Sequence, residues 1–336
     1  MQGRFEHKIE IESRIEEIIK DYPVWFSMYY YSLANNTPAS KRTYINKVGL
    51  FLKYAAELQH CHLGDIDIQC VSTDVINRYF TMRKKELING RPISNAAIAT
   101  QISALKNFFG FLAENEIITE NPMDRALRRP RVKPKETVTY LSKKEKKKIF
   151  DNLENGVGSN IAVSRQSKYR NRDKVIFMLG LSLGCRVSAI DEINISDIDF
   201  TKKELCVIEK GEKPRRYRLH DKLIEQIKFW IKERETLPGS DETEALFVSV
   251  YGGKCKRLTT EAVAKIVRKY STGVDQRVTP HELRRTFGTE FYEKSHDIYA
   301  TATALGHADI STTKRYAAQN KEKVDKIFES VANDLF

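Results

Sequence analysis

A histidine and an arginine near the end of the chain have the spacing of an anion-binding pair. Thr279 and Pro280 predict a helix start, with Thr279 as N-cap, Pro280 in the first position and Glu282 reaching back in a capping box. His281 and Arg284 then lie in the first turns of that helix. Their spacing places the imidazole and the guanidinium on one face, where both can bind a single anion.

A second imidazole, His307, is followed closely by a phenol, Tyr316, in the segment ALGHADISTTKRY. Upstream lies the segment HELRRTF, which contains His281 and Arg284. In this order and at this spacing, the two segments closely resemble the carboxyl-terminal signature of the tyrosine recombinase (phage integrase) family, which reads His-x-x-Arg, Leu-Gly-His and then a nucleophilic Tyr. The resemblance implies that an arginine and a lysine farther upstream complete the site.

Both upstream residues have candidates. Arg186 lies in a segment that resembles the family's first arginine motif, LGLSLGCRVSAIDEINISDID. Two predicted strands, 204–209 and 215–219, flank a turn that contains Gly and Pro, which indicates a hairpin. Lys210 at the start of that turn matches the family's catalytic lysine, and Lys213 is the runner-up. The resemblance therefore implies six catalytic groups, in chain order Arg186, Lys210, His281, Arg284, His307 and Tyr316.

One position departs from the family pattern. Many relatives have a carboxylate three residues after the first arginine, where this chain has Ala189. Asp191 and Glu192 are the candidates to compensate, so the residues that support the arginine in this chain stay open.

These side chains suit chemistry on a phosphodiester, whose negative charge repels nucleophiles and grows in the five-coordinate transition state. Forked hydrogen bonds from Arg186 and Arg284 would neutralise that charge, and His307 would donate one more. His281, whose type titrates near neutrality, would relay the proton of the attacking phenol.

The attack by Tyr316 would leave a 3′-phosphotyrosine, and Lys210 would protonate the departing 5′ oxygen. Another 5′ hydroxyl could then reseal the strand without ATP. This chemistry needs neither a metal nor a cofactor, and we expect none. A metal site at His60, Cys61, His62 and Cys70 is disfavoured, because no second pair stands at finger-like spacing.

The resemblance implies a site-specific DNA recombinase, and within that class we favour a mobile-element integrase. Three alternatives stay open: a resolvase of chromosome or plasmid dimers, a type IB topoisomerase that does not exchange strands, and a DNA-binding factor that has lost activity. Strand exchange in an assembled tetramer would separate a recombinase from a topoisomerase.

Composition agrees with a nucleic-acid partner. The 336 residues carry a formal net charge of +12 with both signs well mixed, which favours a folded protein with a basic face. We expect double-stranded DNA as the partner, although an ordinary basic protein would show the same charge.

No run approaches the roughly 18 apolar residues that span a membrane, and no export signal begins the sequence. With five scattered cysteines, this predicts a cytoplasmic protein with reduced thiols.

Length and pattern predict two domains. Residues 1–127 read as an all-α bundle that resembles the family's core-binding (SAM-like) domain. Residues 128–139, with two prolines among many basic residues, read as an extended linker along DNA or a plain tether. Residues 140–319 should form a mainly α catalytic domain with a small antiparallel β-sheet, the integrase/recombinase catalytic fold. A helix within 320–336 would dock on a neighbouring subunit or on its own domain.

The family implies a homo-oligomer, with a dimer on each site and a tetramer in synapsis, and leaves room for an accessory directionality protein. Among the helices, apolar spacing predicts a stripe of isoleucines within 8–21 and helices that start at Ser72, Ser94, Ser142 and Thr259 or Thr260. The Ser72 helix should run toward Leu87. Residues 156–172 read as a basic loop, and Lys265, Arg268 and Lys269 are candidates to face DNA.

Overall fold

The computed structural model describes residues 2–88, 90–126, 130, 140–209, 213–307 and 309–313. The chain divides into two compact units, Met1–Pro134 and Lys135–Phe336, called here the N-terminal and C-terminal units. Each has a hydrophobic core of its own, and each is described by itself.

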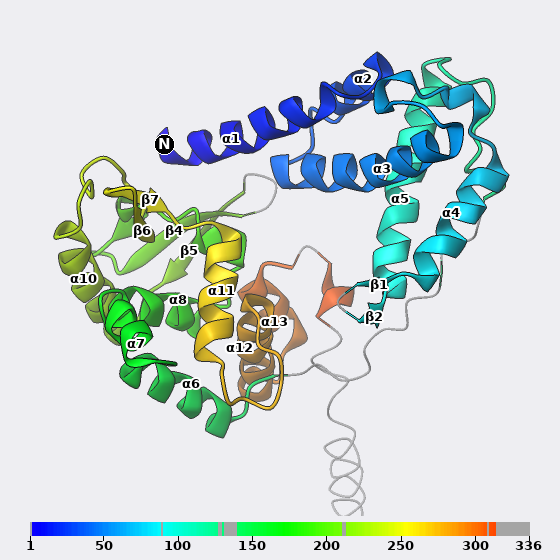
Figure 1. Ribbon diagram of the computed structural model, residues 1–336. Coiled ribbons are helices and arrows are strands. Elements are labelled where there is room, and N and C mark those ends of the chain that lie inside the picture. The colour runs from blue at the N-terminus through cyan, green and yellow to red at the C-terminus, as the bar shows by residue number, and fades with distance from the viewer. Residues whose placement is uncertain are drawn as a thin grey trace, which may run out of the picture. The chain divides into compact units, whose positions relative to one another are not determined.

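Five α-helices and two 3-10 turns make up most of the described part of the N-terminal unit (Figure 1). Several begin at a side chain that accepts a hydrogen bond from the first turn. The Ser72 and Ser94 hydroxyls accept from the backbone N–H groups of Val75 and Ala97, as the sequence predicts. The elements are α1 (Gln2–Ile19), α2 (Val24–Ser32), α3 (Pro38–Gln59), η1 (Leu63–Asp65), η2 (Ile68–Cys70), α4 (Thr73–Lys85) and α5 (Asn95–Glu114).

Aromatic rings form the centre of this core. Phe26 and Tyr29 of α2 are fully buried and pack against Phe108 of α5, with Phe26 and Phe108 edge to face. Of the isoleucine stripe predicted within 8–21, Ile15 and Ile19 are buried in this core, whereas Ile18 is 47% exposed because α1 turns it away.

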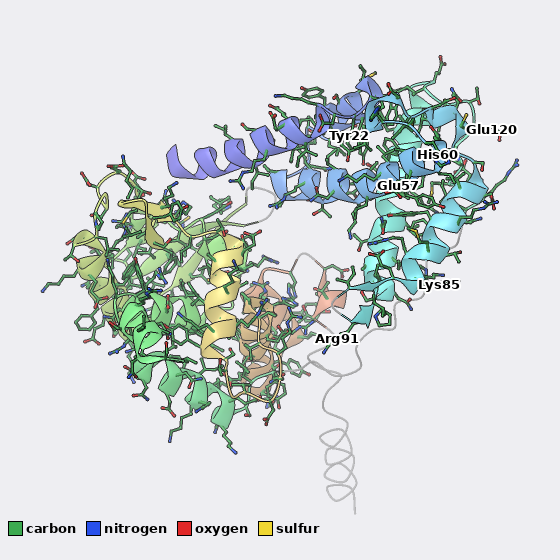
Figure 2. All side chains as sticks on the ribbon, viewed as in Figure 1. Tyr22, Glu57, His60, Lys85, Arg91 and Glu120 are labelled. Carbon is green, nitrogen blue, oxygen red and sulfur yellow. The ribbon has the colours of Figure 1, made fainter. Side chains whose placement is uncertain are left out.

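A short hairpin interrupts the helices of this unit. The helix predicted to reach Leu87 ends at Lys85, where Glu86 adopts an extended backbone. Strands β1 (Leu87–Ile88) and β2 (Arg91–Pro92) then pair antiparallel. Gly90 between them has φ +73°, a conformation that favours glycine. Figure 2 labels Lys85 and Arg91, the exposed basic residues on either side of this turn.

The C-terminal unit is mainly helical and contains two small antiparallel sheets. Helix α8 lies between α10 and α12, and its buried face includes Val175, Ile176 and Leu179 (Figure 1). The helices are α6 (Lys143–Asn155), α7 (Asn160–Ser167), α8 (Arg170–Ser182), α9 (Val187–Ile190), η3 (Ile195–Asp197), α10 (Asp221–Glu235), α11 (Thr260–Tyr270), α12 (Pro280–Ser295), α13 (Ile298–Leu305) and η4 (Ile310–Thr312).

The strands of both sheets lie between Ile198 and Arg257. Strands β3 (Ile198–Asp199), β4 (Glu204–Glu209) and β5 (Lys213–Arg218) form one sheet in that order. Strands β6 (Val248–Tyr251) and β7 (Lys254–Arg257) form a hairpin whose turn is the predicted Gly252-Gly253. The antiparallel pairing of β4 with β5 extends to Glu209 and Lys213, the last residue of β4 and the first residue of β5.

The loop predicted for 156–172 is wrong. Helix α7 occupies its centre, started by Ser159, whose hydroxyl accepts from the Ala162 N–H at 3.4 Å. Helix α8 already begins at Arg170. The glycines at 156 and 158, both with positive φ, mark only the turn before the Ser159 cap.

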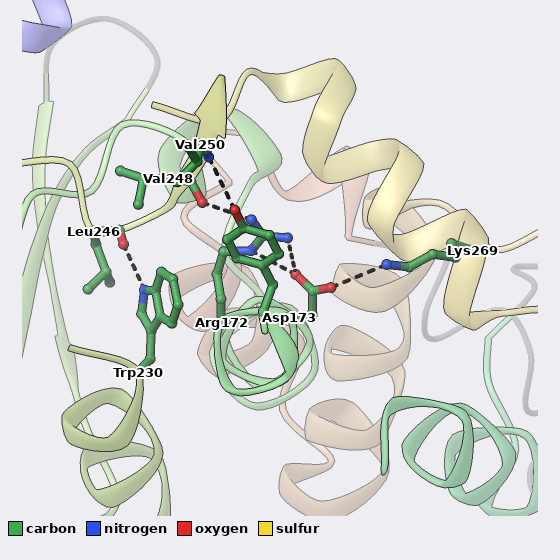
Figure 3. A network of polar contacts seen from close by, with 8 residues as sticks. Arg172, Asp173, Trp230, Leu246, Val248, Val250 and Lys269 are labelled. Carbon is green, nitrogen blue, oxygen red and sulfur yellow. Dashed lines mark hydrogen bonds and ion pairs between the residues drawn. The ribbon is translucent and has the colours of Figure 1, made fainter. Parts of the chain in front are cut away.

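A buried ion network explains why this basic segment is ordered (Figure 3). Arg172 donates to Asp173 from Nε at 2.8 Å and to the Val248 carbonyl from Nη1 at 2.8 Å, which ties α8 to β6. Lys269 of α11 reaches the other carboxylate oxygen of Asp173 at 3.4 Å. The prediction that Lys269 faces DNA is therefore wrong, whereas Lys265 and Arg268 are exposed.

The five cysteines are free thiols. Within the described ranges, none of the helices combines the length and apolar character needed to cross a membrane.

Candidate active site

Helix α12 begins at the predicted residue but with a different cap. Thr279 is the N-cap and Pro280 the first helical residue. The Thr279 hydroxyl donates to the Glu282 carboxylate and makes no hydrogen bond to the first-turn backbone, so the predicted capping box is wrong. The start nevertheless fixes the register, with His281 exposed in the first turn and Arg284 buried in the next.

The two predicted arginines converge on the end of α13. Arg284 donates from Nη1 to the Gly184 carbonyl at 2.5 Å and from Nη2 to the Leu305 carbonyl. Arg186, the N-cap of α9, donates from Nη2 to the next carbonyl, Gly306, at 3.0 Å. Residues that are distant in sequence are therefore held together, as the sequence predicts for two guanidiniums that address one anion.

Their proximity also appears in the electrostatics. Burial lowers the pKa of Arg186, and the positive charge of Arg284 lowers it further. The half-buried guanidinium stays charged because arginine titrates far above neutrality. Two neighbouring positive charges thus stand at this place, as a phosphate site requires.

Helix α13 supplies the next predicted residue. Asp297 caps its start, accepting from the N–H groups of Tyr299 and Ala300, and Gly306 ends it with φ +61°. The backbone then turns so that the His307 N–H donates to the Ala302 carbonyl at 3.0 Å. On the side chain, Nδ1 of His307 lies 2.8 Å from Oγ1 of the buried Thr313. This contact fixes the orientation of the imidazole ring.

A third arginine, which the sequence argument did not select, also reaches this helix end. Arg215 of β5 donates from Nη2 to the Thr303 carbonyl at 2.8 Å and to the Ala304 carbonyl at 2.5 Å. Its guanidinium lies 4.7 Å from the centre of the Tyr217 ring. The run KPRRYR gave a signal, since 215 and 217 share one strand face, but nothing in it separates Arg215 from its basic neighbours.

The chain before Arg186 is shaped by close packing. Gly184 has φ +63°, and a Cβ there would overlap the Phe287 ring of α12. Its neighbour Cys185 is buried, which raises the pKa of the thiol to about 12. The positive charges of Arg284 and Arg215 act on the same thiol, which places it beside the arginine cluster.

One candidate to replace the missing carboxylate, Asp191, faces α11. Ala189 is buried in the core, and the carboxyl of Asp191 accepts from the hydroxyl of Thr260 on α11. The backbone carbonyl of Asp191 accepts from Arg257 of β7 at 2.8 Å. Asp191 thus joins α9 to α11 and β7, and its carboxyl is occupied by Thr260.

Two of the six predicted groups, Lys210 and Tyr316, lie outside the described residues, as does the runner-up Lys213 side chain. The helix predicted within 320–336 and the linker at 131–139 also lie outside them. Across the described ranges, no group of His, Cys, Asp or Glu side chains is arranged to hold a metal ion.

Comparisons with known proteins agree with this geometry. Residues 139–323 match the model of the phage integrase family. Tyrosine recombinase XerC of Proteus mirabilis is 30% identical over 237 residues, which cover 70% of this chain and 72% of XerC. Tyrosine recombinase XerD of Staphylococcus epidermidis is 27% identical over 320 residues, covering 93% and 97% of the two chains.

Solved structures show the same fold. The site-specific recombinase XerH in a post-cleavage complex with a palindromic difH substrate superposes with a TM-score of 0.63 at 20% identity, covering 89% of this chain and 81% of XerH. A lambda integrase dimer bound to a core site gives a TM-score of 0.60 at 19% identity, covering 87% and 93%. The predicted fold class is confirmed.

Proposed function

Because this chain belongs to the phage integrase family and is a site-specific tyrosine recombinase, an enzyme that cleaves and rejoins DNA, we propose that six residues perform its reaction. The observation that carries the proposal is the convergence of Arg186 and Arg284 on adjacent carbonyls just before His307. The proposed catalytic groups are Arg186, Lys210, His281, Arg284, His307 and Tyr316.

The arginines and His307 would hold the scissile phosphate. Their hydrogen bonds to backbone carbonyls are bonds to neutral groups, and both guanidiniums would donate forked hydrogen bonds to the two non-bridging oxygens. As the phosphorus becomes five-coordinate and these oxygens gain charge, the hydrogen bonds strengthen. His307, fixed by Thr313 through Nδ1, would donate from Nε2 to the same oxygens.

Cleavage transfers the phosphate from sugar to protein. The phenolic oxygen of Tyr316 forms a bond to phosphorus, its proton passes to His281, and the bond from phosphorus to the 5′ oxygen breaks. Lys210 gives that oxygen a proton. Rejoining reverses each step, with a 5′ hydroxyl from the same or another strand attacking the phosphotyrosine.

The Tyr316→Phe variant tests this assignment. On a nicked duplex, which traps the cleaved strand, the wild type should form a covalent protein–DNA adduct and the variant none. The matched control is Tyr299→Phe, which removes the hydroxyl of a tyrosine that is 68% exposed on α13. An adduct that persists in Tyr316→Phe and carries DNA on another residue would refute Tyr316 as the nucleophile.

The N-terminal unit and the linker at 128–139 would hold the opposite face of the duplex. Support comes from the net charge and from the exposed Lys85 and Arg91 at its hairpin. The segment 320–336 would dock on a neighbouring subunit, with a dimer on one site and a tetramer when two sites meet. Light scattering of the protein with one site and with two sites would measure both states, and a purified system would show whether an accessory protein is needed.

Two biological roles are proposed, integration of a mobile element and resolution of chromosome or plasmid dimers. The similar proteins include Xer recombinases as well as a transposon integrase and lambda integrase, so their names favour neither. Plasmids with two directly repeated candidate sites should be resolved in the second role, whereas integration should join two dissimilar sites. Relaxation of supercoils on any sequence by a monomer would instead indicate a topoisomerase.

A further inference from the structure

Four consecutive carbonyls at the end of α13 accept hydrogen bonds from three arginines. Arg215 donates to the carbonyls of Thr303 and Ala304. Arg284 donates to the carbonyl of Leu305, and Arg186 donates to that of Gly306. The last carbonyls of a helix lack partners within it and carry the negative end of the helix dipole. They are therefore a natural anchor for guanidinium groups.

Arg215 differs from Arg186 and Arg284 because it lies on a β-strand, which its hydrogen bonds join to the end of α13. It lies on β5, opposite Val207 of β4, and the pairing of Glu209 with Lys213 closes the hairpin just beyond it. Lys210, the proposed proton donor, directly follows β4 in the sequence. Arg215 therefore joins the second strand of this hairpin to the helix end that precedes His307.

The anchor has support on its strand side as well. The Tyr217 ring beside the guanidinium is buried, and burial raises the pKa of its phenol. The Tyr217 hydroxyl also forms a hydrogen bond with the thiol of Cys185, the residue next to Arg186. Contacts on both sides thus hold Arg215 between the strand and the arginine cluster.

We propose that Arg215 is a positioning residue that fastens the Lys210 hairpin to the end of α13 and so sets the proton donor against the phosphate held by Arg186 and Arg284. This inference rests on the role proposed above for Lys210. The role follows from the hydrogen bonds of Arg215 to the Thr303 and Ala304 carbonyls, which join β5 to α13. Loss of Arg215 should slow protonation of the leaving 5′ oxygen and spare the binding of DNA.

A modified substrate separates this role from a general structural one. When sulfur replaces the bridging 5′ oxygen, the leaving group is a thiolate, which departs without a proton because thiols are far more acidic than alcohols. Loss of a general acid costs about 10²–10⁴-fold in rate, and this cost should disappear on the sulfur substrate. We therefore compare single-turnover cleavage of both substrates by the wild type, Arg215→Ala and Lys210→Ala.

We expect Arg215→Ala to cleave the normal substrate at least about 10-fold more slowly than the wild type, as displacement of a general acid would cause. On the sulfur substrate, both Arg215→Ala and Lys210→Ala should cleave at the wild-type rate. Arg215→Lys, which keeps the charge but loses the fork, should fall between Arg215→Ala and the wild type. The matched control is Arg216→Ala. Arg216 points to the other strand face, is 75% exposed and pairs with Glu204 at 3.7 Å, so its loss should leave both rates unchanged.

The outcomes are distinct. If Lys210→Ala is rescued by sulfur and Arg215→Ala is not, Arg215 acts through another group and the inference is overturned. A wild-type rate for Arg215→Ala on the normal substrate overturns it as well. If sulfur does not rescue Lys210→Ala, the proposed role of Lys210 fails, and the inference fails with it. Far-UV circular dichroism confirms folding, and Arg215→Lys carries the test should Arg215→Ala not fold.

Discussion

Replacing Asp191 by asparagine should stabilise the protein, and it should do so more strongly at alkaline pH than at pH 5. Asp191 is 6% exposed, and its carboxyl accepts from the Thr260 hydroxyl. Its other oxygen, Oδ1, has no hydrogen-bond partner within the described ranges. Burial raises the pKa of this carboxyl from 3.8 to about 7.

The sign follows from proton binding. Between pH 4 and 7 the native state keeps a proton on Asp191 that the unfolded state releases, so raising the pH favours unfolding. Each pKa unit corresponds to about 1.4 kcal/mol. The rise from 3.8 to about 7 therefore costs the native state roughly 4 kcal/mol above pH 7. An asparagine still accepts from Thr260 and cannot ionise, so this cost is absent from the variant.

Urea unfolding at pH 5 and pH 8.5 measures the effect. In a Trp25→Phe background, fluorescence of the buried Trp230 reports on the C-terminal unit alone. The free energy of unfolding of Asp191→Asn should exceed that of the parent by up to about 4 kcal/mol at pH 8.5 and by only about 1.6 kcal/mol at pH 5. The exposed Asp241→Asn serves as control. An equal difference at both pH values would refute the reasoning.

The same variant decides whether Asp191 compensates for the carboxylate that Ala189 replaces. Its carboxyl is taken by Thr260, and the charges that act on it are those of Glu192, Arg257 and Glu261. We therefore expect Asp191→Asn to cleave a nicked duplex at the wild-type rate at pH 7. A rate lower by about 10-fold or more, about 1.4 kcal/mol in the barrier, would show that this carboxyl supports the arginines.

Three further outcomes are expected. Gly184→Ala should lower the free energy of unfolding by about 2–4 kcal/mol, since a Cβ at φ +63° is strained and overlaps Phe287; it should also slow cleavage, because the Gly184 carbonyl positions Arg284. Ser142→Ala should cost about 1 kcal/mol in urea unfolding, because it removes the capping box with Glu145. Affinity for DNA should fall by about 10³-fold or more between 50 and 200 mM salt in a fluorescence anisotropy titration; a flat dependence would contradict the basic-face argument.

Local signals in the sequence predicted the elements that local contacts decide. Ser72, Ser94 and Ser142 begin helices as predicted, because each hydroxyl bonds to a backbone N–H three residues on. The error at 156–172 has the opposite cause. Arg172 looks like a solvated loop residue, and only the carboxylate of Asp173 and the carbonyl of Val248 give it a buried place.

In the candidate site, too, local motifs predict some residues and miss those that tertiary contacts select. The motifs identified Arg186, Arg284 and His307, and in the structure the two guanidiniums bond to the carbonyls of Gly306 and Leu305, just before His307. Arg215 was missed because its partners are backbone carbonyls, which every residue possesses and no residue type marks. The contact of the β4–β5 hairpin with α13 likewise results from tertiary packing, which leaves no periodic pattern in the sequence.

The choice of carbonyls as partners has a consequence for catalysis. A carboxylate would neutralise Arg186 or Arg284 in a strong ion pair, and the phosphate would have to displace it at a cost. A carbonyl fixes the direction of the guanidinium but leaves its charge, which is why Arg284 lowers the pKa of Arg186. Repulsion between the two is relieved when negative charge develops between them, and this relief is greatest in the transition state. Ala189 is buried and carries no charge, whereas the end of α13 accepts hydrogen bonds from Arg186, Arg215 and Arg284. We therefore expect the geometry of this helix end to fix the directions of the three guanidiniums.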